Sequence, residues 1–205
     1  MLKNYFKIAF RNFRRQKLYS FINVFGLAVG LAFCTLVFLY VRDELSFDHF
    51  HVQRDRIYRV YTARYHPDGS TEARNAWLPM PLGPAMKADL PEVEQYVRFR
   101  KIEYFVRAGV EAQEEEILFA DASIFDVFTF PLLQGNPATA LADPGSVVLT
   151  EGMARKYFGD EDPEGRQLAI RFTDRFEDFT VTGVAEQPPG NSSIRFGFSC
   201  PSLGS

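Results

Sequence analysis

The feature that most constrains this chain is an uninterrupted apolar run near its N-terminus. From Phe21 to Val41 the sequence reads FINVFGLAVGLAFCTLVFLYV and contains no charged residue. An α-helix rises about 1.5 Å per residue, so roughly 20 residues cross the ~30 Å hydrocarbon core of a bilayer. A helix also satisfies its own backbone hydrogen bonds, as any segment in lipid must. The run therefore predicts a transmembrane helix over residues 20–42.

A cleaved secretory signal peptide is the main alternative for this run. Its apolar core would be about 7–15 residues long, and small residues would mark the cleavage site. Here the run is longer, ends in the bulky sequence Phe38-Leu39-Tyr40-Val41 and is followed directly by Arg42-Asp43-Glu44. These features favour a membrane anchor that is not cleaved.

Charge is distributed unequally along the chain. Residues 1–42 carry seven basic residues and no acidic one, whereas the remaining 163 residues carry 16 basic and 26 acidic residues, a net charge of −10. Such asymmetry points to a membrane or a nucleic acid at the basic end, but the acidic remainder argues against nucleic-acid binding. Segments rich in Lys and Arg beside a membrane helix stay on the cytoplasmic side of the membrane. We therefore expect a cytoplasmic N-terminus and an acidic domain on the opposite side of the membrane.

The segment before the run, residues 1–19, predicts a basic amphipathic helix on the cytoplasmic membrane surface. Apolar residues recur at spacings of three and four, and basic residues lie largely off that stripe, which suits contact with anionic lipid. The alternative is a cytoplasmic stub that contributes only charge. The residues assigned to the membrane surface and topology are Lys3, Lys7, Arg11, Arg14, Arg15 and Lys17.

A G-x-x-x-G pattern lies inside the predicted transmembrane helix, at Gly26 and Gly30. Small residues at this spacing allow two membrane helices to approach closely. The pattern predicts that these glycines pack against other helices, although it does not identify the partner helix.

Beyond the run, strand and helix signals alternate, which predicts a mixed α/β domain of the α+β class over residues 43–205. Turn sequences at 66–70 and 108–109 predict hairpins. In chain order we expect a short helix from Ser46, a hairpin over 56–77, a helix over 81–90, a hairpin over 93–119, a helical turn over 123–128, a strand over 146–149, a helix over 150–158, a hairpin over 167–185 and a last strand over 194–198.

Four features of this domain invite a functional interpretation, and each has a simpler structural one. His49 and His51 lack a third metal ligand at a defined spacing, so we expect them on a helix side that faces solvent or the bilayer surface. The run Glu114–Glu116 is typical of a solvated hairpin edge. The phenylalanine-rich segment Phe119–Phe130 is typical of a domain core, and Trp77 of a partly buried strand.

Motifs for catalysis or cofactor binding are absent from the sequence. It contains no Walker A loop, no G-x-G-x-x-G, no G-x-S-x-G and no C-x-x-C. Two cysteines, Cys34 and Cys200, cannot form a disulfide framework. We therefore expect no enzymatic activity, no metal site, and no bound ATP or dinucleotide in this chain.

Several segments carry a resemblance to a known family. The opening MLKNYFKIAFRNFRRQKLYSFINVFGLAVGLAF, then VRDELSFDHFH and DRIYRV, is similar to the start of FtsX-like ABC transporter permeases. The later segments resemble the MacB-like periplasmic core domain found in them: PLGPAMKADLPEVE, ILFADASIFDVFTFPLLQGNPATAL, SVVLTEGMARKYFGDEDPEGRQL and FTVTGVAEQPPGNSSIRFGF. The match covers nearly the whole chain in order.

This resemblance implies a permease of the bacterial inner membrane, with a large periplasmic domain between its first two transmembrane helices. It would pair with a second permease copy or paralogue and with a separate cytoplasmic ATPase, which alone would bind ATP. A periplasmic adaptor or an outer-membrane protein would be a further partner. In this family ATP-driven helix movements are transmitted to the periplasmic domain, a mechanism called mechanotransmission that serves efflux or lipoprotein and peptide export.

The chain stops at Ser205, where members of the family continue. We therefore expect the N-terminal part of a permease, with a truncated periplasmic domain over residues 43–205. The alternative is a single-span, membrane-anchored periplasmic binding or sensor module. A membrane-anchored extracytoplasmic enzyme is a third interpretation, disfavoured because no nucleophile–base or metal spacing is present.

Overall fold

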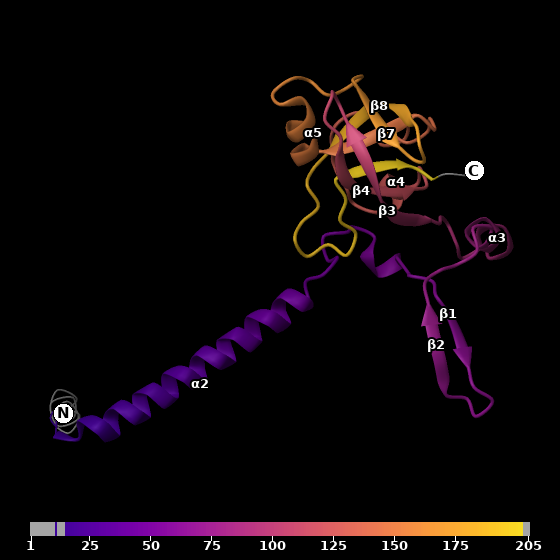
Figure 1. Ribbon diagram of the computed structural model, residues 1–205. Helices are drawn as coiled ribbons and strands as arrows, with labels where there is room; N and C mark the ends of the chain where they lie inside the picture. The colour runs from indigo at the N-terminus through magenta and orange to yellow at the C-terminus, as the bar shows by residue number, and fades with distance from the viewer. Residues whose placement is uncertain (1–10, 12–14, 203–205) are drawn as a thin grey trace. The chain divides into compact units, whose positions relative to one another are not determined.

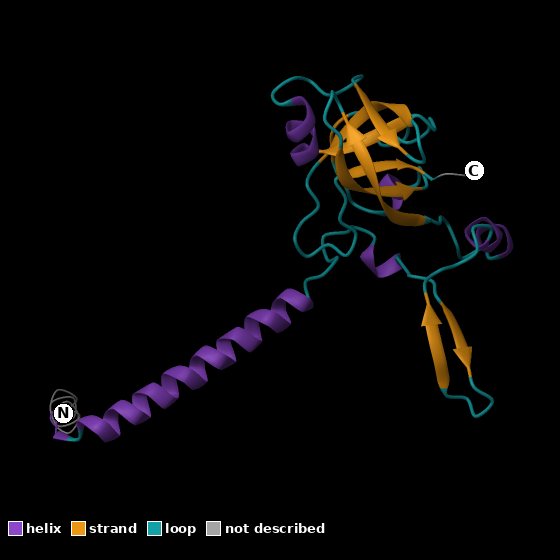
Figure 2. Ribbon diagram, viewed as in Figure 1, coloured by secondary structure: helices purple, strands orange, loops and turns teal. Residues whose placement is uncertain are grey.

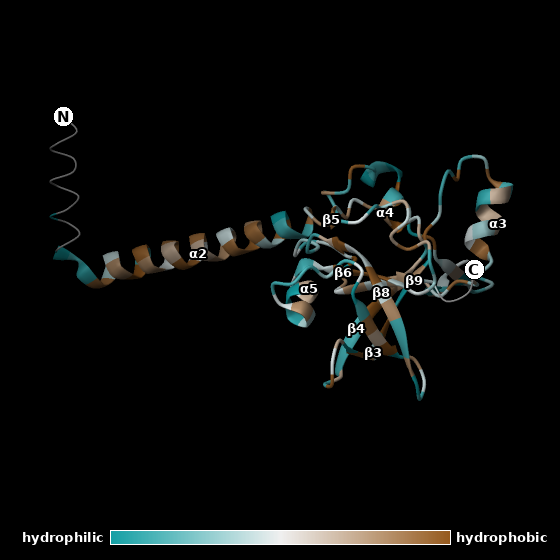
Figure 3. Ribbon diagram, turned by 90° about the horizontal axis from the view of Figure 1, so that it is seen from above, coloured by the Kyte–Doolittle hydropathy of each residue, from teal (hydrophilic) through white to brown (hydrophobic). Residues whose placement is uncertain are grey.

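The structure is a computed structural model that describes residue 11 and residues 15–202. The chain forms two compact units, Met1–Phe47 and Asp48–Ser205. In the first unit, helix α2 (Lys17–Glu44) has no buried residue and is apolar around its circumference between hydrophilic ends (Figure 3). Among the described residues, it is the one helix long and apolar enough to cross a membrane.

The second unit is built around a ring of six paired strands (Figures 1 and 2). The strand order is β8–β6–β9–β4–β3–β7, and β7 pairs again with β8, which closes the ring into a small barrel. Most neighbours are antiparallel, but β4–β9 and β6–β8 are parallel. The barrel strands are β3 (Phe99–Arg107), β4 (Gln113–Ala120), β6 (Ser146–Thr150), β7 (Gln167–Arg171), β8 (Phe176–Ala185) and β9 (Phe198–Pro201).

Side chains alternate between the two faces of each strand, and both faces of the barrel wall are apolar. One face forms an inner core to which every barrel strand contributes, with Phe119 and Phe198 as its largest fully buried members. The opposite face forms an outer core in which Leu118 and Val148 pack with Ile124, Phe130 and residues of the loop before β9. The expectation that Phe119–Phe130 belongs to a domain core is confirmed.

Short elements complete the second unit. The 3₁₀ turn η1 (Arg54–Arg56) precedes a separate two-stranded hairpin, β1 (Thr62–Tyr65) and β2 (Thr71–Asn75). Helix α5 (Glu151–Phe158) is capped by Gly159, whose φ of +65° suits glycine. The remaining elements are α3 (Leu82–Asp89), α4 (Ile124–Val127) and β5 (Leu132–Gln134), which pairs antiparallel with the end of β8. The predicted fold class, one membrane helix followed by a mixed α/β domain, is confirmed.

Several local predictions are wrong. Residues 45–50 form turns rather than a helix from Ser46. The last strand is β9, not residues 194–198, because its pairing with β4 and β6 begins at Phe198. Trp77 lies beyond β2 and is 86% exposed. Strand β4 is not at the edge of the sheet, and only 10% of the Glu115 side chain is exposed, because α5 covers it. Glu114 and Glu116 are exposed as expected.

The carboxylate of Glu115 is hydrogen-bonded to two side chains of α5. Its Oε1 accepts hydrogen bonds from the Tyr157 hydroxyl at 2.8 Å and from the Lys156 ammonium at 2.5 Å. Burial, together with Glu115, raises the pKa of Tyr157, so the phenol stays a hydrogen-bond donor. The acidic run is therefore part of the attachment of α5 to the barrel.

Gly135 supplies a test of the barrel architecture. Its φ is +88°, and a Cβ there would lie 2.8 Å from Gly183 Cα and closer still to the Thr182 carbonyl oxygen. We expect Gly135→Ala to lower the free energy of unfolding by ~3 kcal/mol, because strain and backbone overlap add. Urea denaturation of the full chain in mild detergent, followed by circular dichroism, measures this.

Gly159→Ala is the matched control. This glycine also has a positive φ, of +65°, but a Cβ there would meet no atom within 4 Å. Gly159→Ala should lower the free energy of unfolding by only ~1 kcal/mol, because only the positive φ is unfavourable for alanine. Equal losses for the two variants would contradict the close approach of β5 to β8.

Candidate functional site

The segment that follows the membrane helix is fastened to the outer core of the barrel. We call Asp48–Val52 the junction clip; only residues 45–47 separate it from the end of α2. The Asp48 backbone N–H donates to the Asn191 carbonyl oxygen at 3.0 Å. The Ser193 N–H donates in turn to Asp48 Oδ1 at 2.8 Å. Asp48 thus holds the loop before β9 from both its backbone and its side chain.

His51 forms the second half of the clip. Its Nδ1 accepts a hydrogen bond from the Thr129 backbone N–H at 3.0 Å, and the Val52 N–H donates to Thr129 Oγ1 at 2.9 Å. The imidazole packs against the rings of Phe128 and Phe130, with centroid distances of 5.2 and 5.3 Å. Only 3% of His51 is exposed, so the prediction that it faces solvent or the bilayer surface is wrong.

These contacts require a neutral His51. Because Nδ1 accepts a hydrogen bond, the ring proton lies on Nε2, which is buried without a hydrogen-bond partner. Burial lowers the pKa of His51 and the carboxylate of Asp48, 3.9 Å from Nε2, raises it; the net pKa lies below the ordinary value. The clip is therefore fully formed at neutral pH and is weakened by acid.

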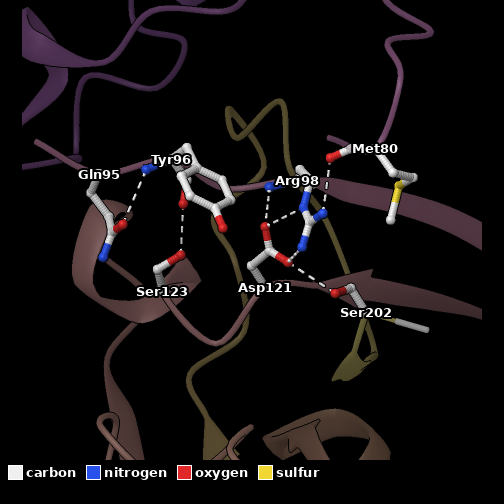
Figure 4. A network of polar contacts seen from close by, with 7 residues as sticks. All are labelled: Met80, Gln95, Tyr96, Arg98, Asp121, Ser123 and Ser202. Carbon is white, nitrogen blue, oxygen red and sulfur yellow. Dashed lines mark hydrogen bonds and ion pairs between the residues drawn. The ribbon is translucent and has the colours of Figure 1, made fainter. Parts of the chain in front are cut away.

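A second polar network ties together four separate segments (Figure 4). Arg98, just before β3, donates from Nε and Nη2 to both carboxylate oxygens of Asp121, just after β4, at 2.9 and 2.8 Å. Arg98 Nη1 also donates to the Met80 carbonyl oxygen, ahead of α3. The Ser202 hydroxyl, just after β9, donates to Asp121 Oδ1 at 2.9 Å. This network joins the ends of β3, β4 and β9 to the segment that leads into α3.

The Arg98–Asp121 pair is partly shielded from water, with 21% and 12% of the two side chains exposed. Burial acts to raise the pKa of Asp121, but hydrogen bonds from Arg98 and Ser202 outweigh it and the net pKa is lowered. Beside the pair lies an open groove of about 520 Å³, lined in part by Lys87, Tyr96 and Ser123. Since Arg98 is engaged by Asp121, the arrangement suits a structural junction better than catalysis.

The site residues predicted from sequence lie in the first unit. A Cβ on Gly26 or Gly30 would meet no atom within 4 Å, so this face of α2 is open to another helix. Arg11, Arg15 and Lys17 are exposed, in accord with a surface role. Lys3, Lys7 and Arg14 lie outside the described residues. The helix-packing and membrane-surface roles of these residues stay predictions.

Neither the junction clip nor the Arg98–Asp121 network was predicted from the sequence. Asp48 and His51 are three residues apart, but nothing local indicates that Thr129 and Ser193 come to meet them. Arg98 and Asp121 meet because the β3–β4 register brings the two strand ends together. Among the described residues, no group of three or more His, Cys, Asp or Glu side chains could hold a metal ion.

The buried histidine predicts a specific pH dependence of stability. Because its pKa is lowered on folding, the unfolded chain binds the proton more readily, so stability falls as pH drops below about 6.5. We expect His51→Gln to remove this part of the acid sensitivity, measured as the difference in unfolding free energy between pH 8 and pH 5. His49→Gln and His66→Gln are the controls, because both histidines are exposed. An unchanged pH profile in His51→Gln would contradict the buried neutral ring.

The Arg98–Asp121 network predicts a graded loss of stability. Asp121→Ala leaves a partly buried guanidinium without its partner and should cost ~3 kcal/mol, measured by urea denaturation. Ser202→Ala removes one hydrogen bond and should cost ~1 kcal/mol. Replacing both charged residues, as Arg98→Met with Asp121→Leu, should recover part of the loss. Equal effects of Asp121→Ala and Ser202→Ala would rule out the pair as the centre of the network.

Comparison with known proteins adds to this picture. A domain assigned to a permease protein from Porphyromonas gingivalis has a TM-score of 0.57 and 26% sequence identity, covering 69% of this chain and 60% of that chain. The periplasmic region of MacB from Actinobacillus actinomycetemcomitans has a TM-score of 0.41 and 20% identity, covering 53% and 48%. The extracellular domain of the ABC-type transporter YknZ from Gram-positive bacteria has a TM-score of 0.41 and 19% sequence identity, covering 53% of this chain and 55% of that chain. No curated protein is matched.

The family comparison is the most extensive of these. The sequence profile of the MacB-like periplasmic core domain matches residues 20–199, which include most of α2 and the barrel strands as far as the start of β9. This profile describes a domain of transporter permeases and not a class of enzymes. The chain therefore belongs to the family of MacB-like periplasmic core domains of ABC transporter permeases.

Proposed function

We propose that this chain is the N-terminal part of an ABC transporter permease subunit that couples a separate cytoplasmic ATPase to a periplasmic domain. The observation that carries the proposal is the junction clip: after a linker of three residues beyond α2, Asp48 and His51 are hydrogen-bonded to loops of the second unit, at Asn191, Ser193 and Thr129. The transmitted movement would serve efflux or the export of lipoproteins or peptides. This chain itself would bind no cofactor, and ATP would be held by the partner ATPase.

The clip suits mechanical transmission for a physical reason. A displacement of α2 along its axis would reach Asp48 through residues 45–47. A linker of three residues can change its length only slightly, so most of the displacement would be passed on. Four hydrogen bonds and the ring contacts of His51 then pass the displacement to the loop before β9 and to Thr129. A closed barrel has few open edges along which it could deform, so it would move as one body.

The membrane arrangement follows from charge. With the basic N-terminal segment in the cytoplasm, the domain would lie in the periplasm and α2 would cross the bacterial inner membrane. The open face at Gly26 and Gly30 would receive a helix of the same permease, of a second copy or of a paralogue. Anionic lipid would contact Arg11, Arg15 and Lys17, and an adaptor or outer-membrane protein would be a periplasmic partner.

Loosening the connection between helix and clip tests the proposal. We expect a flexible eight-residue Gly-Ser insertion after Phe47 to preserve co-purification of an ATP-hydrolysing subunit from native membranes. The insertion should abolish ATP-dependent changes in amide hydrogen exchange over residues 48–53 and 190–196, because slack in the linker absorbs the displacement.

The control carries the same insertion after Gly109, between β3 and β4, where it should leave the ATP-dependent exchange intact. Persistence of ATP-dependent exchange despite the insertion after Phe47 would contradict transmission through the clip. Recovery of the unaltered chain without any ATPase would instead support the single-span binding or sensor module.

A further inference from the structure

The junction clip consists of two hydrogen-bonded halves that hold different loops of the second unit. In the first half, Asp48 forms two hydrogen bonds with the loop before β9, one through its backbone N–H and one through its carboxylate. In the second half, His51 and Val52 each form one hydrogen bond with Thr129, in the segment between α4 and β5. The residues that follow the membrane helix are therefore attached at two separate places.

Only the second half depends on the protonation state of His51. Its Nδ1 accepts a hydrogen bond from the Thr129 N–H at 3.0 Å, which an imidazolium cannot do because both of its nitrogens carry a proton. The second nitrogen offers no compensation: within the described residues Nε2 has no hydrogen-bond acceptor, and Asp48 Oδ1 is 3.9 Å away. Three phenylalanine rings surround the imidazole, with centroid distances of 4.0, 5.2 and 5.3 Å. A charged ring is therefore unfavourable at this place.

The first half contains no imidazole, and its two hydrogen bonds need no change when His51 gains a proton. Other charged side chains lie on the segments packed against the ring: Asp126 on α4, Glu186 after β8 and Arg195 before β9. Arg195 donates to two backbone carbonyl oxygens of its own loop. Among the described residues, Asp48 is the one carboxylate within 4.0 Å of a ring nitrogen of His51. The charge that acts on the imidazole is therefore that of Asp48.

We propose that the junction clip is an acid-sensitive switch that releases Thr129 while Asp48 stays bound to the loop before β9. At neutral pH the clip holds both loops. In acid, His51 gains a proton, leaves the phenylalanine rings and gives up Thr129, and the Asp48 carboxylate attracts its positive charge. The membrane helix is then connected to one loop instead of two. A weaker ATP-driven coupling in acid is the consequence, and this consequence alone rests on the proposed function.

The direction of the pH dependence follows from the burial of His51. Burial lowers the pKa of His51 in the closed clip, whereas a released histidine has an ordinary pKa of about 6.5. Opening therefore becomes easier as the pH falls below about 6.5, by about tenfold for each pH unit until the pKa of the closed clip is reached. Asp48 raises the pKa of His51, so removal of its charge should shift the release to lower pH.

Amide hydrogen exchange tests the switch, because each half of the clip contains two backbone N–H donors. The N–H groups of Val52 and Thr129 report on the second half, and those of Asp48 and Ser193 on the first. Exchange is followed by nuclear magnetic resonance on the full chain in mild detergent and corrected for the intrinsic effect of pH. Between pH 7.5 and pH 5.5 we expect the protection of Val52 and Thr129 to fall about tenfold. The protection of Asp48 and Ser193 should stay constant, as should that of Phe119 in the inner core, the reference for global unfolding.

Three variants separate the groups involved. In His51→Gln the side-chain oxygen can still accept from Thr129 but no proton titrates, so the acid-induced loss of protection should disappear. His66→Gln replaces an exposed histidine and should behave like the unaltered chain. Asp48→Asn keeps an oxygen that accepts from Ser193 but lacks the negative charge, so the release should begin at a lower pH.

Two results in the unaltered chain would overturn the proposal. The first is an equal loss of protection at all four amides of the clip or at Phe119, because the whole clip or the whole domain would then be opening. The second is constant protection of Val52 and Thr129 down to pH 5.5. Should His51→Gln fail to fold, Asp48→Asn still decides, since an unchanged release or a shift to higher pH contradicts the switch. These measurements involve no ATPase and so stand apart from the insertion experiment.

Discussion

The second unit depends on the pairing of β8 with strands on both of its sides. Its first half pairs with β7 and its second half with β6, so one ten-residue strand closes the ring. Closure gives every barrel strand two neighbours and encloses the inner core. Gly183 lies within this strand because Gln134 of β5 approaches it closely. Without β8 the same strands would form an open sheet with exposed edges.

The outer core connects this barrel to the rest of the chain. It consists of the apolar outer positions of β4 and β6, together with α4 and the phenylalanines around Phe128. His51 enters this cluster as a neutral ring, and Asp48 holds the loop that follows β8. The junction clip therefore uses the packing that stabilises the barrel, so the proposed coupling needs no separate mechanical element.

The Arg98–Asp121 network and the separate hairpin differ in how completely their side chains are covered. Around the Arg98–Asp121 pair, four chain segments satisfy one another's charges and hydrogen bonds. Around the hairpin, by contrast, Tyr58 and Trp77 face solvent and the strand edges lack a third strand within the described residues. Met80 connects these regions, since its carbonyl oxygen accepts a hydrogen bond from Arg98 and the two hairpin strands precede it in the chain. The network would therefore anchor the hairpin segment to the barrel.

The sequence by itself determined the elements whose signals are local. The uncharged run specifies α2, turn residues specify the hairpins, and Gly159 specifies the end of α5. Only the tertiary structure decided contacts between distant segments: the burial of His51 beside Thr129, the Arg98–Asp121 pair, and the start of the last strand at Phe198. The physical reason is that strand register and ring closure depend on partners far apart in the chain, which periodicity and turn chemistry do not encode.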